Sequence, residues 1–177
     1  DSSAGAVDRW GYIVSLLYDI RNCYKLTYVV DNETVKEETY KYEQTVTAME
    51  TPVKAGYTFS GWDKTIPTAM PAEDVTLSGS FTANKNTKYT VEYYKENLDG
   101  TFAKESEIKE AETDTEVEAE IKEFTGFTHA TNNTNNVLEG TVAGDGSLVL
   151  KVYYTRNSYR LTYVVDNETV KEETYKY

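Results

Sequence analysis

Histidine and cysteine are almost absent from this chain, which has one of each among its 177 residues. A Ser-His-Asp or Cys-His catalytic group needs a histidine with an orienting carboxylate, and the sequence pattern gives His129 no such constellation. A disulfide or metal framework needs several cysteines, so Cys23 is interpreted as a solitary thiol. The sequence therefore predicts no catalytic, cofactor-binding or metal-binding residue, and the protein is expected not to be an enzyme and to need no cofactor.

Basic residues and long apolar runs are also scarce. Lys plus Arg number 18 against 30 for Asp plus Glu, which gives a net charge of -12. Such a chain repels phosphate backbones, so nucleic acid is not an expected partner. The most apolar early stretch, residues 11–20, is too short and too interrupted to span a bilayer, so no membrane insertion is expected from this fragment.

Carboxylates are abundant, and adjacent pairs such as Glu37-Glu38 and Glu172-Glu173 have the residue type that a glycosidase uses. A glycosidase holds its pair across a cleft, and domains of about 60 residues leave little room for one. The sequence has no D-x-D-x-D-G calcium loop. The acidic pairs are therefore interpreted as solvated faces.

Tyrosine is the abundant aromatic residue, with 16 copies, and this composition is typical of small β-rich domains. Tyrosine rings stack on sugars, so a glycan-binding face is one interpretation. Packing across strands is the other, and we favour it because most of the tyrosines lie in alternating patterns. The tyrosines in question are Tyr24, Tyr28, Tyr89, Tyr93 and Tyr153.

A long internal repeat dominates the sequence. Residues Arg21 to Tyr42 read RNCYKLTYVVDNETVKEETYKY, and Arg156 to Tyr177 match them at 20 of 22 positions with an offset of 135 residues. A fixed period indicates a tandem array. The chain is interpreted as one period with ragged ends: residues 158–177 form the truncated start of the next unit, and residues 1–22 are an irregular segment in the position of a preceding repeat's end.

The first predicted domain covers residues 23–84. Large side chains alternate along its first strand, at Tyr24, Leu26, Tyr28 and Val30. Asp31-Asn32 then predicts a hairpin turn, since both residues tolerate turn conformations. Gly61 lets the backbone bend so that Trp62 folds over the core, and Val75, Leu77 and Phe81 predict a closing strand with an irregularity at Gly79. Residues 44–49 are expected to form a short strand or one helical turn.

This domain carries the pattern Pro52-x-x-x-Gly56-Tyr57-x-Phe59-x-Gly61-Trp62, followed by Asp74-Val75-Thr76-Leu77. It resembles the Listeria-Bacteroides repeat, also called the internalin B-repeat. Two departures are visible: Phe81 replaces the family's final Trp, and Asp31-Asn32 replaces the usual Gly-Gly after the first strand.

The second predicted domain covers residues 88–157. Tyr89, Val91 and Tyr93 alternate, and the turn Asn97 to Gly100 predicts a hairpin with residues 101–108. Residues 107–123 are compatible with a short amphipathic helix, but residues 113–120 alternate and we favour a strand. Residues 137–142 and 148–154 are expected to form a second hairpin around Gly144-Asp145-Gly146.

The opening V-x-Y-Y strand, Gly126-Phe127 and the final Leu148-x-Leu150-x-Val152-x-Tyr154 strand of this domain resemble the mucin-binding-protein repeat family. The two resemblances imply a mainly β, β-grasp-like fold, in two small consecutive domains of a tandem-repeat array. They also imply an extracellular location on a bacterial cell surface.

Two functions are expected to compete. One is a structural stalk that presents a distal adhesin, in which each domain contacts its neighbouring repeats and length comes from copy number. The other is a multivalent module with weak affinity for mucin, host glycans or host proteins. A further expectation is strand exchange between molecules through the truncated unit at residues 158–177, whose edge is open to a partner.

Overall fold

The computed structural model describes residues 22–177. It contains 13 strands in this range, and the prediction of a mainly β chain is confirmed, while the β-grasp-like arrangement stays a prediction. Apart from Asn22, the predicted N-terminal segment 1–22 lies outside the described residues. The described residues form two compact units. The first contains residues 22–54 and 58–82, and the second contains residues 55–57 and 83–177. Nowhere in them does a helix reach the length and apolarity of a membrane span.

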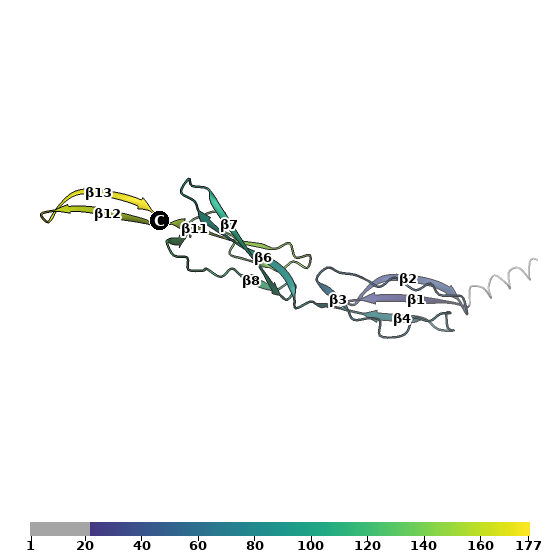
Figure 1. Cartoon of the computed structure of the whole chain (residues 1–177). Coiled ribbons are helices and arrows are strands. Elements are labelled where there is room, and N and C mark those ends of the chain that lie inside the picture. The colour runs from purple at the N-terminus through teal and green to yellow at the C-terminus, as the bar shows by residue number, and fades with distance from the viewer. Residues whose placement is uncertain (1–21) are drawn as a thin grey trace, which may run out of the picture. The chain divides into compact units, whose positions relative to one another are not determined.

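The first unit is built on a three-stranded sheet in the order β2-β1-β4 (Figure 1). Its strands are β1 (Cys23–Val30), β2 (Glu33–Lys41) and β4 (Val75–Gly79). The turn between β1 and β2 places Asp31 and Asn32 at φ values of 51° and 68°, the left-handed conformation that a two-residue hairpin turn requires. β4 then returns parallel to β1. The chain interrupts the predicted closing strand after Gly79, because the short β5 (Phe81–Ala83) pairs instead with β3 (Tyr57–Phe59).

The core of the first unit joins the hairpin β1–β2 to the residues that follow it. The hairpin contributes Leu26, Tyr28 and Tyr40, and the later segment contributes Val46, Met70 and Leu77. Trp62 folds over this core as predicted, with its ring 5.1 Å from that of Tyr28 and edge-on to it. Residues 44–49, expected as a strand or helical turn, form neither, and only Thr45 makes an isolated bridge, to Ala69.

The second unit is built on a four-stranded sheet in the order β7-β6-β11-β9. Its strands are β6 (Thr87–Glu96), β7 (Phe102–Ala111), β9 (Phe127–His129) and β11 (Val149–Arg156). The predicted turn before residue 101 joins β6 to β7, with Gly100 at a φ of 84°. The strand favoured over a helix is present as β8 (Glu116–Glu118), which pairs with β10 (Glu139–Thr141).

The predicted hairpin of residues 137–142 with 148–154 is wrong. Only Val137 and Lys151 form a bridge between these segments, while β10 pairs with β8. β11 lies inside the sheet, parallel to β6 on one edge, and β9 takes only Tyr154 to Arg156 of the other edge. After the single bridge at Val137, the chain leaves β11 and pairs with β8 instead.

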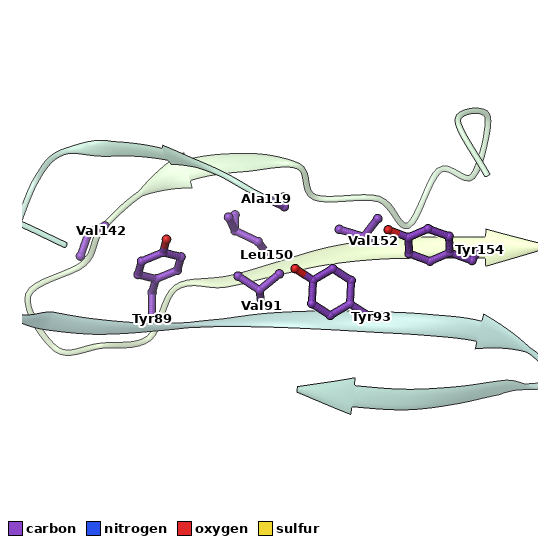
Figure 2. Packing of buried hydrophobic residues seen from close by; sticks show 8 residues of the cluster. All are labelled: Tyr89, Val91, Tyr93, Ala119, Val142, Leu150, Val152 and Tyr154. Atoms are coloured by element: carbon purple, nitrogen blue, oxygen red, sulfur yellow. The ribbon is translucent and has the colours of Figure 1, made fainter. Parts of the chain in front are cut away.

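The core of the second unit lies on one face of its central parallel pair (Figure 2). Alternation along the two strands brings the side chains to this face. β6 and β11 contribute Tyr89, Val91, Tyr93, Leu150, Val152 and Tyr154, and Ala119 and Val142 cover them.

A third hairpin follows directly after β11. It consists of β12 (Ser158–Val165) and β13 (Glu168–Lys176), drawn in yellow in Figure 1. The two strands pair only with each other within the described chain. This hairpin is the second copy of β1–β2 in the repeat.

Candidate functional site: the joint between β11 and the hairpin that follows

The two scarce residues lie in different units. His129 ends β9, with its ring 5.9 Å from that of Tyr154 and its Nε2 buried without a hydrogen-bond partner in the described chain. Cys23 begins β1 and is exposed, in the other unit. Among residues 22–177, no three His, Cys, Asp or Glu side chains gather closely enough to hold a metal ion.

The acidic pairs lie on the surface and form ion pairs with lysine or arginine. Glu37 and Glu38 are neighbours on β2 and therefore face opposite sides of it. Glu37 pairs with Lys25 at 2.8 Å, and Glu38 pairs with Lys36 at 3.0 Å. Side chains on opposite faces cannot act on one substrate, so this pair is not a glycosidase site.

Most of the tyrosines singled out in the sequence pack within the units. Tyr28, Tyr89 and Tyr93 are buried in the two cores. Tyr153 lies on the outer face of its sheet, where its ring stacks on that of Tyr94 at 4.4 Å with the planes 4° apart. Packing therefore accounts for these four residues.

An open groove with a mixed lining, of about 410 Å³, lies in the first unit. Trp62 forms part of its wall, beside the hydroxyls of Ser60 and Ser78 and the carboxylate of Asp63. The Asp63 carboxylate accepts a hydrogen bond from the backbone N–H of Ser78 at 2.7 Å, which fixes its position. An aromatic surface next to fixed polar atoms has the composition of a ligand groove.

The second unit has a well-defined joint at its end, where a single residue separates β11 from β12. This residue, Asn157, donates its N–H to the Gly126 carbonyl at 2.8 Å and accepts the N–H of Tyr177 at 2.9 Å. Its side-chain oxygen accepts a hydrogen bond from Thr128 at 2.7 Å. The connection therefore has no free backbone length, and both strands of the hairpin are tied to it.

Glu96, at the end of β6, connects three parts of the joint. Its carboxylate accepts the N–H of Arg156 at 2.9 Å and pairs with Lys176 at 2.6 Å. Its carbonyl accepts a hydrogen bond from the Arg156 Nε at 2.7 Å. The same guanidinium also donates through Nη1 to the carbonyl of Tyr177. One carboxylate thus links β6, the end of β11 and the last residues of the hairpin.

Aromatic contacts also hold the last residue of the hairpin to the preceding unit. The ring of Tyr177 lies edge-on to that of Phe127, with centroids 5.9 Å apart, and the Arg156 guanidinium lies 5.0 Å from the Phe127 ring. Tyr177 also lies directly over Gly126, where an added Cβ would collide with the tyrosine ring. Gly126 has a φ of 80°, so glycine suits both the backbone conformation and the close approach of the ring.

The charges of the joint favour an ionised Glu96. The hydrogen bond from Lys176, and after it the one from the Arg156 N–H, lowers the pKa of Glu96 below its ordinary value of 4.5. The carboxylate is therefore charged at neutral pH, and the Lys176 side chain remains about half exposed. Solvent screens this ion pair, so the hydrogen bonds and ring contacts are expected to contribute most of the joint's stability.

Only part of this site could be predicted from the sequence. Gly126-Phe127 and the repeated Arg-Asn dipeptide were visible, the latter as residues 21–22 and 156–157. Glu96 was not identified, because its partners lie 60 and 80 residues further along the chain. The repeat is the sequence signal that points to Arg156. This residue is repeated at Arg21 but lies before the first strand of the repeated hairpin, so packing within that hairpin does not explain why it is repeated.

Three comparisons with known proteins bear on this arrangement. Residues 24–82 match the model of the Listeria-Bacteroides repeat domain, which confirms the resemblance of the first domain. The comparison with curated proteins finds no significant match to the chain.

Among solved structures, domains 3-4 of the Streptococcal High Identity Repeats in Tandem from a cell surface protein share 16% identity, covering 76% of this chain and 98% of theirs, with a TM-score of 0.26. Mub-RV shares 13% over 77% of this chain and 99% of its own, with a TM-score of 0.24. The type 2 repeat of the mucus binding protein MUB from Lactobacillus reuteri shares 11% over 77% of this chain and all of its own, with a TM-score of 0.23. At such TM-scores, none of the three likenesses supports an inference about what this chain binds.

Proposed function

We propose, on the premise that residues 24–82 form a Listeria-Bacteroides repeat domain within a tandem array, that this chain is a non-enzymatic section of the stalk of a bacterial cell-surface protein. In this role the repeats hold an adhesive region away from the cell. The observation that carries the proposal is the joint around Glu96 and Tyr177, which fixes the start of one repeat to the end of the unit before it.

A stalk needs stiff connections, because flexible linkers let successive domains fold back on one another. The joint supplies stiffness by two means. Asn157 is the only residue between β11 and β12, and both of its backbone groups are hydrogen-bonded. Contacts from Glu96 and Phe127 then reach the far strand of the hairpin, at Lys176 and Tyr177. In an array with period 135, such a joint would recur, and total length would follow from copy number.

The stiffness of the joint is measurable as a distance distribution. Spin labels at Glu139→Cys and Thr169→Cys, in a Cys23→Ser background, report on β10 and the hairpin separately. We expect one narrow distribution by double electron-electron resonance. It should broaden in Tyr177→Ala. Tyr175→Ala is the matched control, because the Tyr175 hydroxyl bonds to Glu173 within the hairpin, away from the contacts of Glu96. A broad distribution in the parent chain would contradict a stalk.

The groove beside Trp62 favours a second function, multivalent weak binding of glycans. A tryptophan wall with the Ser60 hydroxyl and the Asp63 carboxylate offers both a stacking surface and hydrogen-bonding atoms for a sugar. Repetition would multiply a weak affinity. A glycan array that compares one period with three periods tests this function, with Trp62→Ala as the site variant. Binding that rises with valency and is lost in Trp62→Ala supports it, and no binding at either valency contradicts it.

A further inference from the structure

The groove beside Trp62 has a single charged side chain, Asp63, among the described residues that line it. Its other polar lining residues are Asn32, Ser60, Ser78 and Ser80. Lys64, the next residue along the chain, is not part of the wall, and its Nζ donates to the Thr76 carbonyl at 3.2 Å. Within residues 22–177, a ligand in this groove would therefore meet one negative charge and no basic lining residue that balances it.

The Trp62 ring is held in place by two other rings. The centroid of the Tyr28 ring lies 5.1 Å away and that of the Phe59 ring 5.0 Å away, and both contacts are edge-on. Trp62 is only half-buried, so the rest of its surface is free to form the groove wall. An aromatic surface that is already fixed costs little to order when a sugar ring stacks on it.

Backbone pairing fixes the polar atoms beside Trp62. The Asp63 N–H donates to the Ser78 carbonyl at 2.8 Å, and the Ser78 N–H donates to Asp63 Oδ1 at 2.7 Å. The Ser60 Oγ accepts the N–H of Ser80 at 3.0 Å. A carboxylate only accepts, and it has about four lone-pair sites on its two oxygens. Asp63 therefore keeps acceptor capacity for the hydroxyls of a ligand after its bond from Ser78.

The turn between β1 and β2 supplies a further group to the groove. The Asp31 carboxylate accepts the N–H of Phe81 at 3.0 Å, and the Asp31 N–H donates to the Gly79 carbonyl at 3.1 Å. These bonds fasten the turn to the end of β4 and the start of β5. Asn32, the next residue of the turn, lines the groove with an amide that both donates and accepts. A Gly-Gly turn would supply neither side chain.

This arrangement suits a ligand that has hydroxyls and no negative charge. A sugar ring has an apolar face that can lie on Trp62 and hydroxyls that can donate to Asp63. A carboxylate on the same sugar would meet the Asp63 carboxylate, and like charges at close range repel. We propose, building on the glycan-binding function above, that the groove binds neutral hexoses through Trp62, Asp63 and Asn32, and that Asp63 rejects acidic sugars.

The charge of the whole chain acts in the same direction but at longer range. The net charge of -12 also repels acidic sugars. Salt screens such repulsion beyond about 8 Å at physiological ionic strength, whereas Asp63 acts on a ligand that it touches. Selection by Asp63 should therefore persist in physiological salt and should depend on this one carboxylate.

Hexoses and their uronic acids are matched probes, because they differ only in a hydroxymethyl group or a carboxylate at the same carbon. The probes are the methyl glycosides of galactose, glucose and mannose, each compared with its uronic acid at physiological salt. A titration followed by proton–nitrogen NMR reports weak binding at the Trp62 indole N–H, whose signal is assigned by its loss in Trp62→Phe. We expect at least one hexose to bind, and its uronic acid to bind at least about tenfold more weakly.

Equal binding of each hexose and its uronic acid would overturn the inference and leave the glycan-binding function standing. No shift with any of the six sugars would overturn the inference and count against that function as well. The two failures are therefore distinguishable.

Asp63→Asn removes the charge but keeps an oxygen that can accept the Ser78 N–H. In this variant the ratio of hexose to uronic acid affinity should fall below about threefold. Asp74→Asn is the matched control, because it removes a carboxylate of the same unit that accepts the Lys25 N–H at 2.8 Å and does not line the groove. It should keep the ratio of the parent chain. A ratio that persists in Asp63→Asn, or that falls equally in both variants, would overturn the role of Asp63.

Asn32→Gly tests the contribution of the turn. Glycine accepts the φ of 68° at this position, so the variant should fold while losing the amide. We expect hexose affinity to fall about threefold with the ratio of hexose to uronic acid affinity unchanged, because the amide carries no charge. Unchanged hexose affinity would remove Asn32 from the binding site. None of these outcomes bears on the stiffness of the joint, so the stalk proposal stands or falls separately.

Discussion

The hairpins β1–β2 and β12–β13 place nearly one sequence in two environments. The turn, the register shift and the ion pair along the second strand are the same in both: Lys36 with Glu38 at 3.0 Å has its counterpart in Lys171 with Glu173 at 2.7 Å. Only burial differs, because residues 43–83 cover the first hairpin and nothing in the described chain covers the second. The hairpin's own residues therefore determine its geometry, whereas its contribution to a core depends on a distant segment.

The largest expected effect is a difference in unfolding free energy between alanine substitutions at equivalent leucines of the two hairpins. Leu26→Ala removes a fully buried side chain and should cost about 3 kcal/mol of the first unit's free energy of unfolding. Leu161→Ala removes a half-exposed side chain and should cost less than about 0.5 kcal/mol. Urea unfolding followed by hydrogen exchange of each hairpin measures both. Similar costs at the two positions would mean that the second hairpin is covered in solution.

A smaller effect is expected at Gly126, where the second hairpin is held to the preceding unit. Gly126→Ala adds strain at a positive φ and also collides with the Tyr177 ring. Gly100→Ala adds the same strain at a φ of 84° with open space around it, and it should cost about 1 kcal/mol. We expect Gly126→Ala to cost more and to increase hydrogen exchange at Tyr177 and Asn157. Equal effects of the two variants would show that the ring contact adds nothing.

Acid is expected to loosen the joint that holds the second hairpin. The pKa of Glu96 is lowered below 4.5 by Lys176, so the carboxylate's contribution is complete above pH 4.5 and is lost as the pH falls through the lowered value. The spin-label distance distribution across the joint should therefore broaden as the pH falls below 4.5. Lysine and arginine stay charged over this range, so the change reports on the carboxylate. Glu96→Gln is the control, and it should abolish this pH dependence.

The smallest effect is expected at the ion pairs that the hairpins share. Lys25 with Glu37 and Arg160 with Glu172 are exposed pairs at 2.8 Å and 3.1 Å. Solvent screens such pairs, so Lys25→Ala and Arg160→Ala should leave the urea midpoint of either hairpin unchanged within error. A measurable loss at Lys25 alone would show that burial of the neighbouring face strengthens the pair.

The sequence predicted features that depend on neighbouring residues. Alternation located β1 and β6, the Asp31-Asn32 turn formed as expected, and Trp62 folded over the core after Gly61. These succeed because side-chain direction in a strand and turn conformation are local properties.

Features that depend on distant residues were not predictable from the same patterns. The pairing of β10 with β8 was not predicted, because adjacency in sequence favours a hairpin with β11, whereas the partner of β10 lies earlier in the chain. Glu96 was missed for a similar reason: an acidic residue at a strand end in an acidic chain carries no mark of its partners. A single sequence does not indicate which surface carboxylate meets a residue 80 positions away.

The parallel pairing of β6 with β11 has a mechanical consequence for a chain under tension. The polypeptide enters the sheet at the start of β6 and leaves at the end of β11, and the two strands are adjacent from Thr90 with Val149 to Lys95 with Tyr154. Pulling on the two ends slides these strands lengthwise past each other. All the hydrogen bonds between the two strands then carry the force at the same time, instead of breaking one after another from one end. In a cell-surface tether made of such units, all the hydrogen bonds between β6 and β11 would together resist the pull of flowing liquid.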